Sequence, residues 1–485
     1  MERLPELSGL SHADKDQLIR LLWESLGELR EELSELRAAV QRLETENAAL
    51  RAQLAKDSTN SSKPPASDGL RKTCSLRQPS ERPVGGVPGH PGFTLPRSET
   101  PDFLVDHLPP QHCEACGTPL EAGDCQSRQV FDLPAPVLEV TGHRRWQTRC
   151  GCGHLQQGTF PDEVQAPVQY GPRFRALVVC LTQHQMLPAK RTGELPGAWC
   201  GVHPSTGTVM NLIREAGRRL EPSHRKIAET LLRQPVAGAD ETGVRAGGRL
   251  HRLHVLVTES LSRLSTHPKR GALAFEGLEL LPRFQNILVH DGFKSCAKLE
   301  CGHALCNAHL LRELTFQARH RQQDWAAEMI GLLCEALKTT RLSPQGLTRS
   351  QIEDFRSRYE TKLREGWKLN PPDPPDAYPG PTPQTDTVNL LRRLQDGADE
   401  VLRFTRDPRV PFTNNEAGRE VRMPKVKLKI TGGFRTPAGA QAFCVVRSCL
   451  STLKKQRHPL LTALQAAFSG ADPLILSLIR KQTVR

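Results

Sequence analysis

Two aspartates at the ends of strand-like runs are the first candidates for chemistry in this sequence. Asp240 follows the apolar residues of "VAGADETG", and Asp291 follows "ILVH". Carboxylates on the ends of adjacent strands can converge on a pair of Mg²⁺ ions, one activating an attacking oxygen and the other stabilising the leaving oxygen. A single aspartate at a strand end is also a common cap or turn former, so spacing alone leaves both roles open. Glu241 is the weaker candidate, because in a continuing strand its side chain points to the opposite face from Asp240.

Four cysteines in two close pairs form a second candidate site. Cys113 and Cys116 make a C-x-x-C pair, and Cys150 and Cys152 make a C-x-C pair. Four thiolates in a tetrahedron would hold a structural Zn²⁺ in a small module over residues 103–162, whereas the alternative is a set of buried cysteines without metal. Because the C-x-C half is less regular than a standard zinc knuckle, other residues are possible substitute ligands: His112, Cys125, His143 and His154.

The C-terminal part of the chain is strongly basic. From Arg419 to Arg485 it holds thirteen Lys and Arg residues against two acids, within a chain of formal net charge +13, which favours a polyanionic partner such as DNA. Alternation in "KVKLKI" predicts a strand with Lys425, Lys427 and Lys429 on one face, a row that could follow a phosphate backbone; the alternative is a solvated strand face. The candidate DNA-binding residues are Arg419, Arg422, Lys425, Lys427, Lys429 and Arg435.

A heptad pattern of leucines indicates a coiled coil near the N-terminus. Apolar residues recur at alternating gaps of four and three from Leu22 to Leu54, and the one polar residue in an a position is Asn47. A single asparagine there favours parallel, in-register pairing. The pattern therefore predicts a parallel coiled coil over residues 16–56 that makes a homodimer; the alternative is a helix packed on its own chain.

Composition divides the rest of the chain into segments of different character. No basic start precedes an apolar run and no apolar segment has membrane length, so we expect a soluble cytoplasmic protein without membrane contact, whose fourteen cysteines are reduced or bind metal. Strand-like runs followed by helices indicate an α/β domain. The expected segments are a disordered polar linker over 57–100, a helical DNA-binding segment over 170–232, a catalytic domain over 233–465 with a helical insertion over 307–405, and a basic tail over 466–485.

Several motifs together resemble one known family. They are "KDSTNSSKPPASDG", "GGVPGHPGFTL", the four cysteines, "GADETG", "HPKRG", "ILVHDG", "HALCNAHLLRELTF" and "FTNNEAGREVRMPKVKLKITGGFRT". In this order they resemble a transposase of the insertion sequence 66 family over nearly the full length. The resemblance implies a ribonuclease H-like catalytic domain with a DDE triad, in which Asp240 and Asp291 are the first and second ligands of Mg²⁺ or Mn²⁺. It also implies cleavage of DNA at the element's ends and strand transfer of the 3′-hydroxyl to target DNA, in a bacterial, nucleoid-associated setting and with accessory element-encoded proteins as further partners.

The third acid of the triad departs from the family pattern. That pattern is close to N-N-x-A-E-R, and aligning it with "NNEAGR" puts Gly418 where the glutamate belongs. Glu416 and Glu420 each lie two residues away, about 200° around a helix. Glu416 is the favoured substitute, because an irregular helix start next to Asn414 and Asn415 could turn it inward. The alternative function is therefore a catalytically impaired DNA-binding relic or regulator of the same family.

Overall fold

The computed structural model describes residues 9, 11–57, 60–61, 96–108, 111–119, 126–132, 137–278, 280–343, 345–372, 374 and 384–471. Most of the predicted linker over 57–100 lies outside the described residues, as do residues 472–485 of the predicted basic tail. Among the helices in the described ranges, none is both long enough and apolar enough to cross a membrane.

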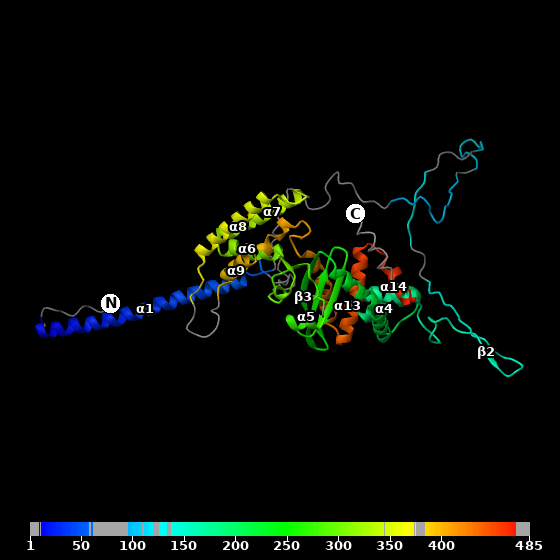
Figure 1. Ribbon diagram of the computed structural model, residues 1–485, viewed down its shortest axis with the longest axis horizontal. Helices are drawn as coiled ribbons and strands as arrows, with labels where there is room; N and C mark the ends of the chain where they lie inside the picture. Colours follow the sequence, from blue (N-terminus) through cyan, green and yellow to red (C-terminus); the bar gives the residue numbers. More distant parts are fainter. Residues whose placement is uncertain are drawn as a thin grey trace.

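A five-stranded mixed sheet forms the centre of the chain (Figure 1). Its strands lie in the order β5-β4-β3-β6-β7. The first three form an antiparallel meander, whereas β6 and β7 run parallel to β3. The bounds are Val236–Ala246 for β3, Arg249–Val257 for β4, Ser262–His267 for β5, Ile287–His290 for β6 and Gly302–Leu305 for β7.

Helices that precede the strands in the sequence and helices that follow them cover the two faces of this sheet. One hydrophobic core contains both Ala239 of β3 and Leu220 of α4. On the other face, Val257 of β4 packs with Ala417 and Val421 of α12. In the described residues from 172 to 468, the helices outside the insertion are α2 (Pro172–Val179), the π-helix η3 (Cys180–His184), α3 (Ala189–Cys200), α4 (Thr206–Leu232), α5 (Ala272–Leu278), the 3₁₀ helix η4 (Cys296–Lys298), α12 (Asn415–Thr431), α13 (Pro437–Lys455) and α14 (Leu460–Phe468).

Helix α13 lies along the edge strand β5 and satisfies part of its backbone. The N–H of Ser262 donates to Oγ1 of Thr452 at 3.0 Å, and the N–H of Leu264 donates to Oγ of Ser448 at 2.8 Å. Unpaired N–H groups on an edge strand invite pairing with another chain. Side chains spaced four apart on α13 therefore close this edge of the sheet.

Between β7 and α12, the described residues include six helices that form a separate bundle with a core of its own. That core surrounds the buried side chains of Trp325 and Tyr359, and the Tyr359 hydroxyl donates to the carbonyl of Leu394 at 2.8 Å. The helices occupy the part of the chain in which the sequence predicts a helical insertion. They are α6 (Asn307–His320), α7 (Asp324–Leu342), α8 (Arg349–Leu369), α9 (Asp386–Asp396), α10 (Ala398–Val401) and α11 (Arg403–Arg406).

A single long helix, α1 (His12–Leu54), begins at a capping box and extends away from the sheet (Figure 1). Ser11 accepts from the N–H of Asp14, whose carboxylate accepts from the N–H of Ser11. Just after the end of α1, Lys56 pairs with Asp386 of the insertion helix α9. In the cysteine-containing segment, Gln147–Arg149 (β1) and Leu155–Gln157 (β2) form an antiparallel hairpin.

Candidate active site

Asp240 and Asp291 lie on neighbouring parallel strands. The pairing of β3 with β6 runs to Gly238 opposite Val289, and the same register continued by two residues sets Asp240 opposite Asp291. Asp291 follows the last residue of β6, as the sequence predicts, but Asp240 lies inside β3 and not at its end. The strand continues because its later residues pair with β4. The two carboxylates are therefore adjacent where β6 ends.

Asn414 fixes the start of α12 over the β3 backbone beside Asp240. Its Nδ2 donates to the carbonyl of Ala239 at 2.6 Å, and its own N–H donates to Sγ of Cys306 at 3.1 Å. A Cβ on Gly238 would collide with Oδ1 of Asn414, so a larger residue there would displace the Asn414 side chain. Because alternate residues of a strand share a face, Asp240 lies on the same side of β3 as this contact. Asn414 was a motif residue in the sequence, and its role in positioning α12 was not predicted.

Burial is the main influence on the Asp240 carboxyl. The pKa of Asp240 is raised to about 6: burial raises it most and the nearby charge of Asp291 also raises it, while the N–H of Glu241, donating at 2.7 Å, and the Lys425 ammonium lower it. The raised pKa shows that a second negative charge beside Asp291 is unfavourable, and a bound cation would relieve this repulsion between the two carboxylates. Oxygen ligands of this kind suit Mg²⁺ or Mn²⁺. The pair therefore fits a divalent metal.

Glu241 lies on the other face of β3, as its place in the strand predicts. Its carboxylate pairs with Arg270, and its Oε2 lies 3.7 Å from Nδ1 of His254 on β4. These contacts hold the side chain away from the Asp240 face, so Glu241 does not join the aspartate pair.

The "KVKLKI" segment is helical, and the prediction of a strand there was wrong. Helix α12 runs without a break from Asn415 to Thr431, and Gly432, at φ 71°, ends it in the left-handed region. Its buried residues Ala417, Val421 and Pro424 recur every three or four positions, which is the period of a helix. Three alternating lysines were too short a pattern to outweigh this longer one.

The helical geometry changes which basic residues lie together. Position 418 shares one face of α12 with Arg422, Lys425 and Lys429, since these positions differ by about one, two or three turns. Lys427 lies about 180° away, and burial lowers its pKa. Arg422 and Lys429 are exposed, and Lys425 is half-buried close enough to Asp240 to affect its carboxyl. A row of basic side chains thus runs along α12 from the aspartate pair. The other two candidate residues are not part of this row: Arg419 pairs with Glu416, and Arg435 lies beyond the end of the helix and is exposed.

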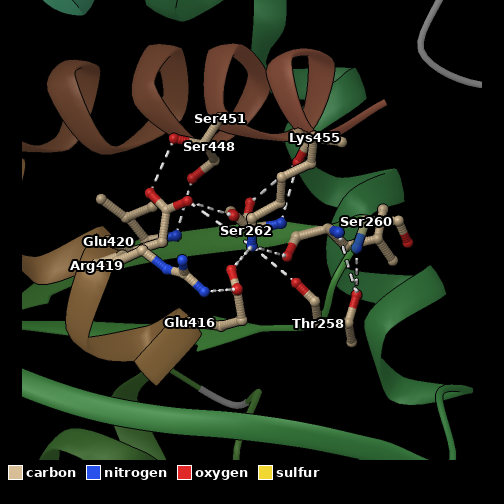
Figure 2. Close-up of polar contacts among 12 residues, drawn as sticks. Thr258, Ser260, Ser262, Glu416, Arg419, Glu420, Ser448, Ser451 and Lys455 are labelled. Carbon is tan, nitrogen blue, oxygen red and sulfur yellow. Dashed lines mark hydrogen bonds and ion pairs between the residues drawn. The ribbon is translucent and has the colours of Figure 1, made fainter. Parts of the chain in front are cut away.

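Glu420 is buried in a polar network between α12, β5 and α13 (Figure 2). Ser262 donates to Oε1 and Ser451 donates to Oε2, both at 2.9 Å. The ammonium of Lys455 lies 3.7 Å from Oε1 and donates to the carbonyls of Thr258, at 2.7 Å, and Leu261. Both carboxylate oxygens are engaged, so Glu420 serves to join three elements.

Glu416 lies on the same side of α12 as Glu420. Its carboxylate pairs with Arg419, one turn along the helix, and lies 3.7 Å from the Lys455 ammonium (Figure 2). The helix start that could have turned Glu416 inward is regular, because the Gly418 N–H donates to the Asn414 carbonyl at 3.1 Å. Within the described ranges, no three His, Cys, Asp or Glu side chains are grouped so that they could hold a metal. The structure therefore does not bring Glu416 to Asp240 and Asp291.

The four cysteines form two separate turns. Cys113 and Cys116 flank a turn closed by the Gly117 N–H on the Cys113 carbonyl, and the Cys116 thiol lies beside Thr118, which lowers its pKa. Cys150 and Cys152 share a similar turn, in which the Cys152 amide and thiol lower the pKa of Cys150. Lowered thiol pKa values suit metal ligands. The described residues do not join the two turns into one four-thiolate group.

Family models match two parts of the chain. A model of the IS66 family of transposases matches residues 167–442, more than half of the chain, and this range includes Asp240, Asp291, the helical insertion and α12. A second model, of a family of unknown function (DUF6444), matches residues 2–95. No curated protein matches the sequence. Since the first match contains the aspartate pair and the helices that surround it, the chain belongs to the IS66 family of transposases.

Proposed function

We propose that this chain is a DDE-type DNA transposase, which cuts a phosphodiester at the ends of its insertion element and transfers the 3′-hydroxyl to target DNA. The observation that supports the chemistry best is the adjacency of Asp240 and Asp291 on parallel strands. Paired carboxylates are the ligands that metal-dependent cleavage of phosphodiesters uses. Family membership supports DNA as the substrate.

The order of the sheet supports a ribonuclease H-like assignment of the catalytic domain. Strands β3, β4 and β5 form an antiparallel meander. On the other side of β3, the sheet continues with β6 and β7, and both run parallel to β3. Asp240 belongs to the first strand and Asp291 follows the fourth strand of this domain. The insertion enters after the fifth strand and returns the chain to α12.

The residues around the aspartates have separate tasks in this proposal. Asp240 and Asp291 would hold Mg²⁺ or Mn²⁺, which when bound supplies activation of the attacking oxygen and stabilises charge on the leaving oxygen. Asn414 holds the start of α12 over β3, and so sets the distance of position 418 from the pair. Lys425 and Lys429 then lie where a phosphate backbone leaving the site would pass.

A cleavage assay tests the proposal. Purified full-length chain, Mn²⁺ and labelled DNA carrying the ends of its element should give cut and strand-transferred products. Asp240→Asn and Asp291→Asn should abolish both products while leaving DNA binding intact, whereas Asp396→Asn, at an exposed position ending α9, should not change either. Cleavage that survives both site substitutions would contradict the proposed role of the pair.

A second candidate function is a DNA-binding regulator without cleavage activity. The observation that favours it is at the third acid: Gly418 carries no ligand, and both nearby glutamates are engaged by other residues. In the same assay, wild-type protein that retards labelled ends without cutting them would support this function. Cutting that depends on Asp240 would exclude it.

We also propose that Cys113, Cys116, Cys150 and Cys152 bind structural Zn²⁺. The two glycine-containing turns and the lowered pKa values of Cys116 and Cys150 support this. Metal analysis of the purified chain should find Zn²⁺ that is lost in Cys113→Ser, and Cys334→Ser, at an exposed cysteine of the insertion, is the matched control.

A further inference from the structure

The short segment that follows α1 lies against the helical insertion. It consists of Lys56 and Asp57 with Asn60 and Ser61, from the motif "KDSTNSS". Asn60 is 5% exposed and Ser61 is 8% exposed, although the composition predicts a disordered linker from residue 57. Polar residues are seldom buried to this degree at the edge of a linker unless they bind something specific.

Two insertion helices supply the partners of this segment. The Lys56 ammonium lies 2.5 Å from Oδ2 of Asp386, the first residue of α9, and 5.4 Å from the ring centre of Phe316 on α6. The side-chain amide of Asn60 lies 3.2 Å from Nε2 of His320, the last residue of α6. One charge pair, one cation–π contact and one polar contact therefore join the segment to both helices.

The local fold of the segment prepares it for these contacts. The Asp57 N–H donates to Oδ1 of Asn60 at 2.8 Å, and the Asn60 N–H donates to Oδ1 of Asp57 at 3.2 Å, so two reciprocal hydrogen bonds hold these residues together. Nδ2 of Asn60 also donates to the carbonyl of Ala55 at 2.8 Å, at the end of α1. Asn60 thus links the end of α1, Asp57 and α6 through one side chain.

Phe316 shows what the contact covers. Its side chain is 2% exposed, yet it belongs to none of the three hydrophobic cores formed by the described residues. Lys56 lies over its ring, and the His320 ring lies 5.2 Å away. The stem of a lysine covers apolar surface well while its ammonium reaches a carboxylate. The segment therefore helps to bury an aromatic ring that lies outside the insertion's own core.

We propose that Lys56, Asp57, Asn60 and Ser61 form a docking segment that fastens α1 to helices α6 and α9 of the same chain. Figure 1 shows α1 ending at these helices. The segment sets where the C-terminal end of α1 lies with respect to the catalytic body, so any chain joined through α1 is also held in a defined position. This role goes beyond the proposed transposase function and does not depend on DNA cleavage.

Hydrogen exchange on the full-length chain, measured by mass spectrometry, tests the docking. Lys56→Glu and Asp386→Lys should each speed exchange about tenfold in peptides covering residues 53–61 and the C-terminal half of α6. The double charge swap should restore most of the protection, which a general loss of stability would not do. Arg51→Glu, an exposed substitution earlier on α1, and peptides from β3 serve as controls and should not change.

A mixing experiment distinguishes docking within one chain from docking between copies. Lys56→Glu chains mixed with Asp386→Lys chains should stay unprotected, because neither chain contains a matched pair. Restored protection in the mixture would show that the segment docks on a second copy and would overturn the proposal. Unchanged exchange in both single variants would overturn it as well. Neither outcome bears on whether the chain cuts DNA.

Discussion

At the scale of single residues, position 418 decides how many acids can meet at the proposed metal site. A Cβ added to Gly418 meets no atom within 4 Å, so the space for a side chain is open. The position shares a helix face with Lys425, which acts electrostatically on Asp240. A glutamate there would start on the side of α12 from which the aspartate pair can be reached, unlike Glu416 or Glu420.

We therefore predict that Gly418→Glu raises Mn²⁺-dependent cleavage of element ends. The expected gain is on the order of 100-fold or more, the size usual for one group that stabilises transition-state charge. The same change should raise the free energy of unfolding by about 0.5–1 kcal/mol, because glycine is unfavourable inside a helix. Cleavage rates and urea unfolding measure the two effects.

Two further substitutions separate these effects. Gly418→Ala should stabilise the chain equally without raising cleavage, and Gly418→Gln should do the same despite its length, because it lacks the carboxylate. If Gly418→Gln accelerates cleavage as much as Gly418→Glu, the gain comes from the helix and not from a third metal ligand.

At the scale of elements, α12 presents three different surfaces. Ala417 and Val421 pack into the core between the helix and the sheet. On one flank, position 418 and Lys425 lie toward Asp240, and on the other Glu420 faces α13. An acid two residues from the expected place therefore belongs to a different surface, which is why neither Glu420 nor Glu416 can replace the missing ligand by a small movement.

The exposed row on α12 makes a prediction about DNA affinity. Arg422→Ala and Lys429→Ala should each weaken binding to any DNA sequence and reduce the slope of log affinity against log salt by about 1, as expected for lost phosphate contacts. Lys427→Ala is the matched control, since Lys427 lies on the opposite side of the helix. Fluorescence anisotropy at several salt concentrations measures the slopes. An equal loss of DNA affinity in all three variants would indicate a general electrostatic attraction, and not phosphate contacts made by one row of side chains on α12.

The polar network on the other flank makes a prediction about stability. Glu420→Ala should lower the free energy of unfolding by about 3–5 kcal/mol, because it leaves the Lys455 ammonium, on a side chain only 13% exposed, without its one buried carboxylate partner among the described residues. Glu416→Ala should cost less than about 1 kcal/mol, since that carboxylate is more exposed and its partner Arg419 reaches solvent. Chemical denaturation at neutral pH compares the two. Similar losses would show that Glu420 does not hold α12 to α13.

How far the sequence could predict these elements depends on the length of each pattern. Asp240 and Asp291 were found because apolar runs precede both residues and family motifs surround them. The strand prediction for "KVKLKI" failed because the helical period appears only when Ala417, Val421 and Pro424 are taken together. The role of Asn414 could not be predicted, because its partners Ala239 and Cys306 are distant in sequence and meet only in the fold.

At the scale of the whole molecule, the chain consists of a catalytic body, a helical insertion and a helix that leaves them. The insertion has its own core and contacts the sheet through β6 and β7. The sequence predicted α1 and the insertion because both carry long helical periods. It did not predict that Lys56 and Asn60 join the two, since such contacts depend on single polar residues at the end of a helix.

The surface of α1 supports the last prediction, a parallel dimer through this helix. Its seam is left open in one chain: Leu26, Leu33 and Leu36 are 50%, 51% and 66% exposed. An isolated helix with an apolar stripe gains most of its stability from a partner, and a second copy offers the same stripe in register, with Asn47 facing its counterpart. Sedimentation of the full-length chain should therefore show a dimer.

Substitutions on the seam test this arrangement. Leu33→Lys with Leu36→Lys should give monomers, whereas Glu35→Lys, which lies off the seam, should not. Asn47→Leu should keep the association and admit larger assemblies, because the buried asparagine specifies a dimer at a cost in stability. If wild-type chains sediment as monomers while circular dichroism shows α1 to be helical, the seam is not a dimer interface. In that case the docking segment would hold α1 for another partner.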